Sequence, residues 1–138
     1  IKEQMDDYEI WGENINIEEG KENVCVIAVT YILEPEFLGE QKSKAAQLGI
    51  KSLLSKGVQP DIVACRSKNK TTKNIKEKIS MYSNITLDNV ISLPDVKSIY
   101  LIPGMIKNTG IAENVMDKLK LEAKLSKKEE EEKEKENA

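Results

Sequence analysis

Two lysines lie where a buried strand is expected to give way to a helix, and their placement indicates chemistry. Residues 39–47 (GEQKSKAAQ) follow an apolar run at 24–32 and precede a segment with helical spacing of apolar residues. Lys42 and Lys44 thus fall at or just before a first helical turn, where free N–H groups point outward. An anion would offset the unfavourable placement of these cations, which predicts a phosphate site. Two solvated lysines on a loop would give the same pattern.

A second basic stretch lies downstream. It holds six basic residues and one acid, Glu77; the basic residues are Arg66, Lys68, Lys70, Lys73, Lys76 and Lys78. Only Tyr82 is nearby to stack a base, and a net charge of −3 gives no general attraction to nucleic acid or anionic membranes. We therefore expect no nucleic-acid and no membrane partner, and interpret most of these lysines as a solvated face. Lys78 stands apart because it leads into the apolar residues of a helix expected to start near Thr72.

The composition argues against a complete enzyme. Histidine is absent, which removes the commonest general base and metal ligand, and the sequence has neither a CxxC pair nor a GK[ST] phosphate loop. We predict no catalytic residue and no metal site in this chain. Cys25 and Cys65 lie inside apolar runs, as buried thiols in a reducing compartment would. Without a long apolar run or an opening signal peptide, we expect a soluble, cytoplasmic protein.

The apolar pattern predicts an α/β fold with a mostly parallel sheet and flanking helices. Strands are expected at residues 24–32, 61–66, 89–92 and 98–102, and helices at 46–54, from 72 onward and at 111–121. Consecutive strand, helix and strand form a right-handed βαβ unit. Arg66 would then lie at the carboxyl end of its strand, the edge at which open α/β sheets bind ligands.

The two ends of the chain are expected to lie outside this fold. Residues 1–19 form an acidic lead-in with one possible short helix at 6–11, and 123–138 are a Lys/Glu-rich tail or linker. The central part, residues 20–122, is expected to be one domain or a piece of a larger one. Its length allows one hydrophobic core at most.

Four motifs in order carry a family resemblance. Residues 20–24 (GKENV), 39–47 (GEQKSKAAQ), 57–67 (GVQPDIVACRS) and 88–103 (DNVISLPDVKSIYLIP) resemble the CTP synthase family, over about a hundred residues. The matching part is the later portion of the family's N-terminal synthetase (amidoligase) domain. The resemblance implies a Rossmann-like (P-loop/dethiobiotin-synthetase-like) fold. It also implies ATP-dependent amination of UTP, with ammonia from a glutaminase domain, in a homotetramer.

The resemblance also assigns residues to ligands. It implies UTP or CTP binding by Lys42, Ser43, Lys44, Ala45, Ala46 and Gln47, together with Lys78. It places Arg66 and the loop Pro94, Asp95 and Val96 around the adenine of ATP. The family's phosphate loop, Mg²⁺ carboxylates and glutaminase domain have no counterpart in this sequence, so the chain alone is expected to be inactive.

The motif departs from the family pattern at several positions. Ser43, Ala45 and Ala46 stand where the family usually has threonine, proline and threonine, and Leu48 and Gly49 replace histidine and serine. Losing the proline reduces preorganisation of the helix start. Two hypotheses stay open: a segment of a working CTP synthase, or a catalytically dead module that binds nucleotide or joins an assembly.

Overall fold

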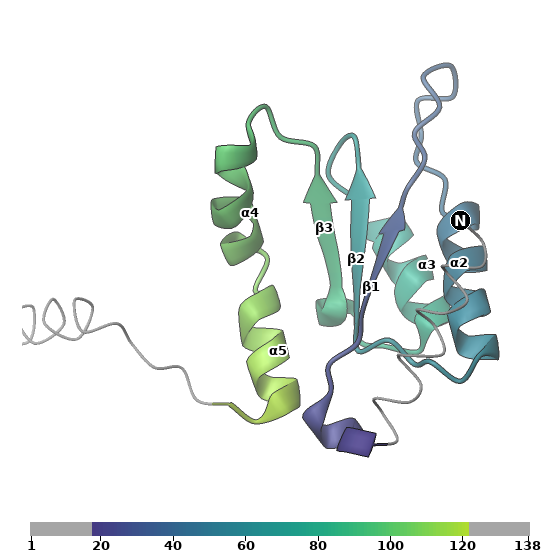
Figure 1. Ribbon diagram of the computed structural model, residues 1–138. Helices are drawn as coiled ribbons and strands as arrows, with labels where there is room; N and C mark the ends of the chain where they lie inside the picture. Colours follow the sequence, from purple (N-terminus) through teal and green to yellow (C-terminus); the bar gives the residue numbers. More distant parts are fainter. Residues whose placement is uncertain (1–17, 122–138) are drawn as a thin grey trace, which may run out of the picture.

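A computed structural model describes residues 18–121 as a three-stranded parallel sheet with helices around it. The strands lie in the order β1-β2-β3, with bounds Ile27–Tyr31, Ile62–Ser67 and Val90–Pro94. The α-helices are α2 (Lys44–Ser55), α3 (Lys73–Ser83), α4 (Ile102–Asn108) and α5 (Ile111–Leu119). Helices α2 and α3 lie together on one side of the sheet, and α4 and α5 run end to end beside β3 (Figure 1). The α/β fold class is therefore confirmed.

The core lies between the sheet and the helix pair α2/α3. It is built from alternate strand residues and from helix residues four apart, namely Ala28, Ile32, Ala46, Ile50, Val63, Cys65, Ile75, Ile79 and Val90. The spacing of Ala46 and Ile50 is the helical period that the sequence indicated. Burial of each large apolar side chain here contributes about 1.5–3 kcal/mol to the stability of the fold, relative to leaving that side chain exposed.

Both cysteines are free thiols within this fold. Cys65 is fully buried in β2, and burial raises the pKa of its thiol to about 11. Cys25 is half-buried just before β1, and burial followed by the nearby charge of Asp61 raises the pKa of its thiol as well. Neither thiol is poised to act as a nucleophile. The interpretation of Cys65 as a small core hydrophobe is confirmed.

The predicted fourth strand at residues 98–102 is wrong. The chain forms a short 3₁₀-helix, η3 (Ile99–Leu101), that continues directly into α4. The Ser98 hydroxyl accepts a hydrogen bond from the Tyr100 N–H at 3.3 Å, and Pro103 occupies the first turn of α4, where its missing N–H costs nothing. Ile99 and Tyr100 are 73% and 87% exposed, and no strand within residues 18–121 pairs with this segment to favour an extended conformation.

The other predicted elements are confirmed with different bounds: β1 and α5 are shorter than expected, whereas α2 begins two residues earlier and β3 ends two residues later. Thr72 caps α3, as its hydroxyl accepts from the Ile75 N–H at 3.4 Å. Helix α5 ends at Leu119 because Lys120 adopts a left-handed conformation with φ of 52°. The predicted short helix at 6–11, most of the acidic lead-in and the tail at 123–138 lie outside the described residues.

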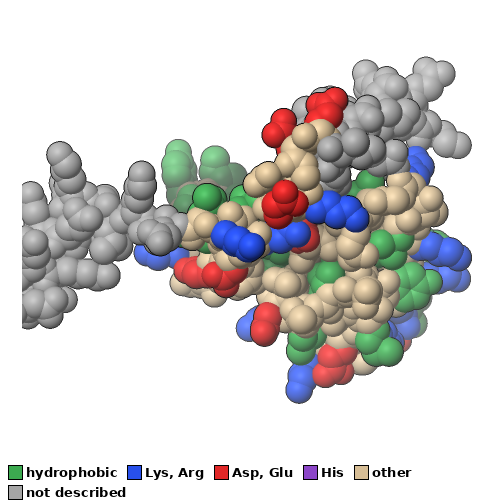
Figure 2. Space-filling view, turned by 90° about the horizontal axis from the view of Figure 1, so that it is seen from below, with side chains coloured by type: hydrophobic (Ala, Val, Ile, Leu, Met, Phe, Trp, Pro, Cys, Tyr) green, Lys and Arg blue, Asp and Glu red, His purple; other side chains and the backbone are tan. Residues whose placement is uncertain are grey.

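Helix α5 is held at the end of the sheet where the strands begin. Lys118 Nζ lies 3.2 Å from the Asp61 carboxylate, which also accepts from the Val26 N–H at 2.8 Å. Asn114 donates to the Asp88 carbonyl at 3.0 Å. Figure 2 views the molecule from this end and shows basic and acidic side chains interspersed, with apolar ones between them. This end therefore carries no single-sign charge patch in the view.

One face of β1 leaves apolar side chains in solvent. Ile27, Val29 and Tyr31 alternate along the strand on the face away from the core, and Val29 is 69% exposed. Within residues 18–121, β1 pairs only with β2. None of the helices in this range is long and apolar enough to cross a membrane.

Candidate functional site

Lys42 and Lys44 lie at the base of a loop, residues 33–42, that projects from the carboxyl end of β1 (Figure 1). The Lys42 N–H donates to the Leu33 carbonyl at 2.7 Å and closes the loop like a short hairpin. Gly39 makes the return turn with φ of 62°, a backbone conformation that residues other than glycine rarely adopt. This closure directs the chain into α2, whose first residue is Lys44.

The start of α2 has the features of an anion site. Ser43 occupies the cap position without capping the helix through its side chain; its hydroxyl accepts from Gln47 Nε2 at 3.0 Å. The first N–H groups of a helix have no intrahelical acceptor, so a ligand can use them. Ala45 is exposed, whereas the Ala46 methyl is buried in the core. Ala46 would therefore reach a ligand only through its backbone N–H.

Lys78 lies on α3, the helix that packs against α2. A hydrogen bond from Lys42 and the charge of that ammonium lower the pKa of Glu40, and the charge of Lys78 lowers it further. Lys42 and Glu40 form an ion pair. Glu40 is fully exposed, so the pair adds little stability. Lys42 and Lys78, 36 residues apart in sequence, lie at the start of α2 and on α3, two helices that pack against each other.

The remaining basic residues are distributed differently. Lys68 pairs with Glu36 at 3.6 Å, and Lys73 lies 3.9 Å from Glu77 on the same helix. Lys70 and Lys76 line an open cavity of about 610 Å³ that lies between β3 and α4. The basic stretch thus divides among several surfaces.

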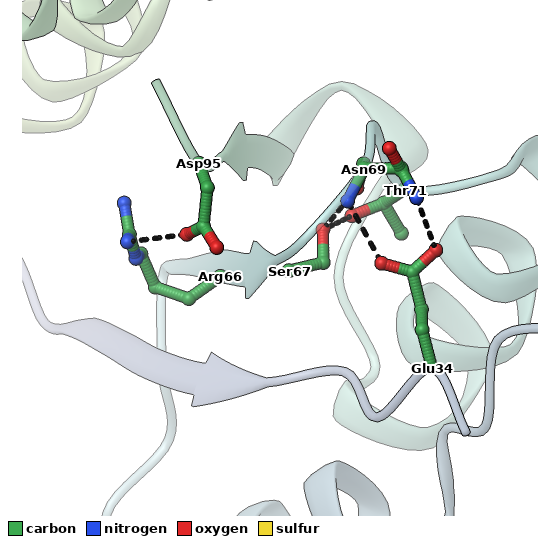
Figure 3. A network of polar contacts seen from close by, with 6 residues as sticks. All are labelled: Glu34, Arg66, Ser67, Asn69, Thr71 and Asp95. Atoms are coloured by element: carbon green, nitrogen blue, oxygen red, sulfur yellow. Dashed lines mark hydrogen bonds and ion pairs between the residues drawn. The ribbon is translucent and has the colours of Figure 1, made fainter. Parts of the chain in front are cut away.

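Arg66 meets Asp95 at the carboxyl edge of the sheet (Figure 3). The guanidinium donates to the carboxylate at 2.9 Å, joining the end of β2 to the loop that follows β3. The Asp95 N–H also donates to the Ser67 carbonyl at 2.9 Å, which continues the strand pairing by one residue. The half-buried Pro94 and Val96 flank Asp95. A planar cation beside a fixed carboxylate suits recognition of a polar ring edge.

The strand register separates this pair from the lysines. Arg66 lies opposite Tyr31 and so shares the face of Ile27 and Val29. Helix α2, which begins at Lys44, packs on the other face. The sequence-assigned residues thus form two groups, one on each side of the carboxyl edge.

Glu34 and Gln41 form a polar clamp that sequence reasoning missed. Glu34 accepts from the Asn69 N–H at 2.8 Å and from Asn69 Nδ2 at 3.3 Å (Figure 3). Gln41 accepts from the Thr72 N–H at 2.9 Å and donates to the Lys70 carbonyl at 3.0 Å. The Asn69 backbone bond is the main reason that the pKa of Glu34 lies below its ordinary value. No local pattern reveals contacts between segments about 30 residues apart.

A resident metal ion has no ligand set in the described part of the chain. Within residues 18–121, no three side chains of histidine, cysteine, aspartate or glutamate lie together in a suitable arrangement.

Comparison with known proteins identifies the family. The model for the CTP synthase N-terminus matches residues 10–121. The chain is 36% identical over 108 residues to the CTP synthase of Pyrococcus horikoshii, covering 78% of this chain and 20% of that protein. It is 39% identical over 110 residues to that of Hydrogenobaculum sp. and 40% identical over 108 residues to that of Clostridium kluyveri, covering 80% and 78% of this chain and 21% and 20% of those proteins.

The chain therefore spans about a fifth of the length of the curated relatives it matches. The matched residues include β1, β2, β3 and all four α-helices of the described region. They also include the lysines at the start of α2 and the Arg66–Asp95 pair. The fold, the extent of the family match and these identities together show that the chain belongs to the CTP synthase family and corresponds to part of its N-terminal domain.

Proposed function

We propose that the chain is the nucleotide-recognition segment of a CTP synthase, an ATP-dependent enzyme that aminates UTP with ammonia from glutamine. UTP or its product CTP is bound by Lys42, Ser43, Lys44, Ala45, Ala46 and Gln47, with Lys78 from the neighbouring helix. The observation that carries this proposal is the position of Lys42 and Lys44 at the start of α2, within the residues that match the family model.

The charge and geometry of this group suit a triphosphate. Ammonium groups on flexible stems bind phosphate as point charges, while the helix start supplies directional N–H donors. The side chain of Lys44, exposed at the first position of α2, has room to turn toward the same ligand. Gln47 is half-buried one turn later and holds Ser43 in place.

The second group is assigned to ATP. In this proposal the hydrogen-bonded pair of Arg66 and Asp95, flanked by Pro94 and Val96, surrounds the adenine. The bound nucleotide would bring Mg²⁺, which polarises phosphates in such reactions. We assign no Mg²⁺ ligand to the described residues.

The partners follow from the same assignment. Within residues 18–121 one edge of β1 has no partner strand, which suits continuation of the sheet by the rest of a synthetase domain. The exposed Ile27, Val29 and Tyr31 suit covering of this face by the same domain. In this proposal residues 20–122 are one part of that domain, and 123–138 link it to a glutaminase domain in a cytoplasmic homotetramer.

A catalytically dead module derived from the same family is the alternative. The departures at Ala45 and Leu48 from the family pattern favour it, since they remove preorganisation and a polar group from the site. Activity of the intact protein that carries this chain separates the two. Ammonia-dependent formation of CTP from UTP and ATP supports the first proposal, and nucleotide binding without turnover supports the second.

The chain by itself is expected to form no CTP. It contributes recognition groups and lacks the glycine-rich loop that would cradle the transferred phosphoryl group. Purified 138-residue chain is incubated with UTP, ATP, Mg²⁺ and ammonia, and CTP is quantified by chromatography. Turnover that co-purifies with the chain would contradict this assignment of roles.

The ATP site is tested by Arg66→Ala in the intact protein. Removing the guanidinium leaves Asp95 without its 2.9 Å partner and takes away the planar surface, so the ATP dissociation constant should rise by on the order of tenfold. UTP binding should stay within about twofold, because Arg66 lies on the opposite face from α2. Calorimetric titration of each nucleotide makes the comparison, and an equal loss of both would contradict separate sites.

A further inference from the structure

The 33–42 loop is joined to the 67–72 loop by the side chains of Glu34 and Gln41. We propose that Gln41, supported by Glu34, is a positioning residue for the nucleotide site. It holds Lys42 at a fixed distance from α3, so that Lys42 and Lys78 bind the same triphosphate. The inference rests on the proposed function and adds to it the residues that assemble the site.

Gln41 forms the connection between the two elements. Its side-chain oxygen accepts from the N–H of Thr72, the cap residue of α3, and its amide nitrogen donates to the Lys70 carbonyl. Gln41 also directly precedes Lys42, whose own N–H is bonded to Leu33. A continuous path of short contacts therefore runs from Lys42 through Gln41 to the helix that carries Lys78.

Glu34 orients Gln41 within this path. One carboxylate oxygen accepts from Gln41 Nε2 at 3.2 Å, and both oxygens bind Asn69. These hydrogen bonds favour the ionised carboxylate, and the pKa of Glu34 is lowered accordingly. The charged group thereby fixes both the rotamer of Gln41 and the position of the 67–72 loop.

Apolar packing does little to hold the 33–42 loop. Phe37 is 88% exposed and Leu38 is 49% exposed, so the tip contributes few buried contacts. The Lys42–Leu33 bridge closes the loop on itself, and the Glu36–Lys68 ion pair is exposed, which leaves the polar clamp as the main attachment of the loop to the 67–72 loop. Without the clamp the loop would occupy several positions, and the apparent affinity would fall in proportion to the fraction of time spent in the competent one.

The test compares Gln41→Ala and Glu34→Ala with Glu36→Ala in the intact protein. Glu36 is a matched control: it lies on the same loop and carries the same charge, but its contact is an exposed ion pair with Lys68. We expect the UTP dissociation constant to rise about fivefold or more in the first two variants, as for a loop that is competent a fifth of the time. Glu36→Ala should leave it unchanged, and ATP binding should be unchanged in all three.

A double-mutant cycle separates positioning from general damage. If Gln41 acts through Lys42, adding Gln41→Ala to Lys42→Ala should cost less UTP affinity than Gln41→Ala costs in the parent. Full additivity, or an equal loss of ATP affinity in Gln41→Ala, would overturn the inference. If the parent binds UTP and Gln41→Ala binds it with the same dissociation constant, only the positioning role is overturned. Absence of both UTP and CTP binding in the parent overturns the proposed function itself.

Discussion

Lys42→Ala in the intact protein is expected to raise the dissociation constants of UTP and CTP together, by on the order of tenfold, with ATP nearly unaffected. A triphosphate brings three to four negative charges to a helix start that already supplies N–H donors, and each lysine lost removes one charge-assisted contact. Lys44→Ala and Lys78→Ala should behave alike. Residual binding should become less sensitive to salt, because fewer charge pairs remain to be screened.

Lys70→Ala is the matched control for this series. Lys70 is an exposed lysine of the same basic stretch, and its backbone carbonyl, which the substitution leaves in place, is the group that Gln41 contacts. Its effect on UTP binding should be within about twofold. UTP is titrated into the parent and the four variants at two salt concentrations. Equal losses at Lys70 and Lys42 would indicate a diffuse basic surface and would remove the basis for the residue assignments.

The sequence predicted the elements whose signals are local and strong. The continuous apolar run of β2, the Ala46–Ile50 spacing of α2 and the Thr72 cap of α3 each reflect a single periodic or capping rule. The parallel sheet followed from the βαβ lengths. The strand predicted at residues 98–102 is a 3₁₀-helix and the start of α4, because β-propensity depends on packing against neighbouring strands and Ser98 caps the 3₁₀-helix. Strand propensity alone does not specify a strand when no partner strand lies beside it.

The sequence predicts site residues only where a charged residue falls at the expected end of a strand or start of a helix. Lys42 and Lys44 at a helix start, and Arg66 at a strand end, are visible in the sequence for this reason. The pairing of Arg66 with Asp95 required the register of β2 and β3. The clamp of Glu34 and Gln41 depends on side-chain bonds to backbone groups about 30 residues away, which no short-range pattern encodes.

Ile79→Ala is expected to lower the free energy of unfolding by about 2–5 kcal/mol, the largest effect of any single substitution considered. Ile79 is fully buried on α3, in the cluster that joins α2, α3 and the sheet. Truncating it removes apolar contacts and leaves a cavity that the surrounding strands close only in part. Urea unfolding followed by far-UV circular dichroism gives the change.

Met81→Ala provides the control on the same helix. Met81 is 83% exposed, so its truncation should change stability by no more than about 0.5 kcal/mol. Ile79→Val, with an expected loss of about 0.5–1.5 kcal/mol, gives a measurable transition even where the alanine variant is too unstable to unfold cooperatively. The order of the three losses is then the decisive result. A loss for Met81→Ala equal to that for Ile79→Val would mean that another surface covers this side of α3, in contradiction to the exposure of Met81. A negligible loss for both Ile79 variants would place the core elsewhere.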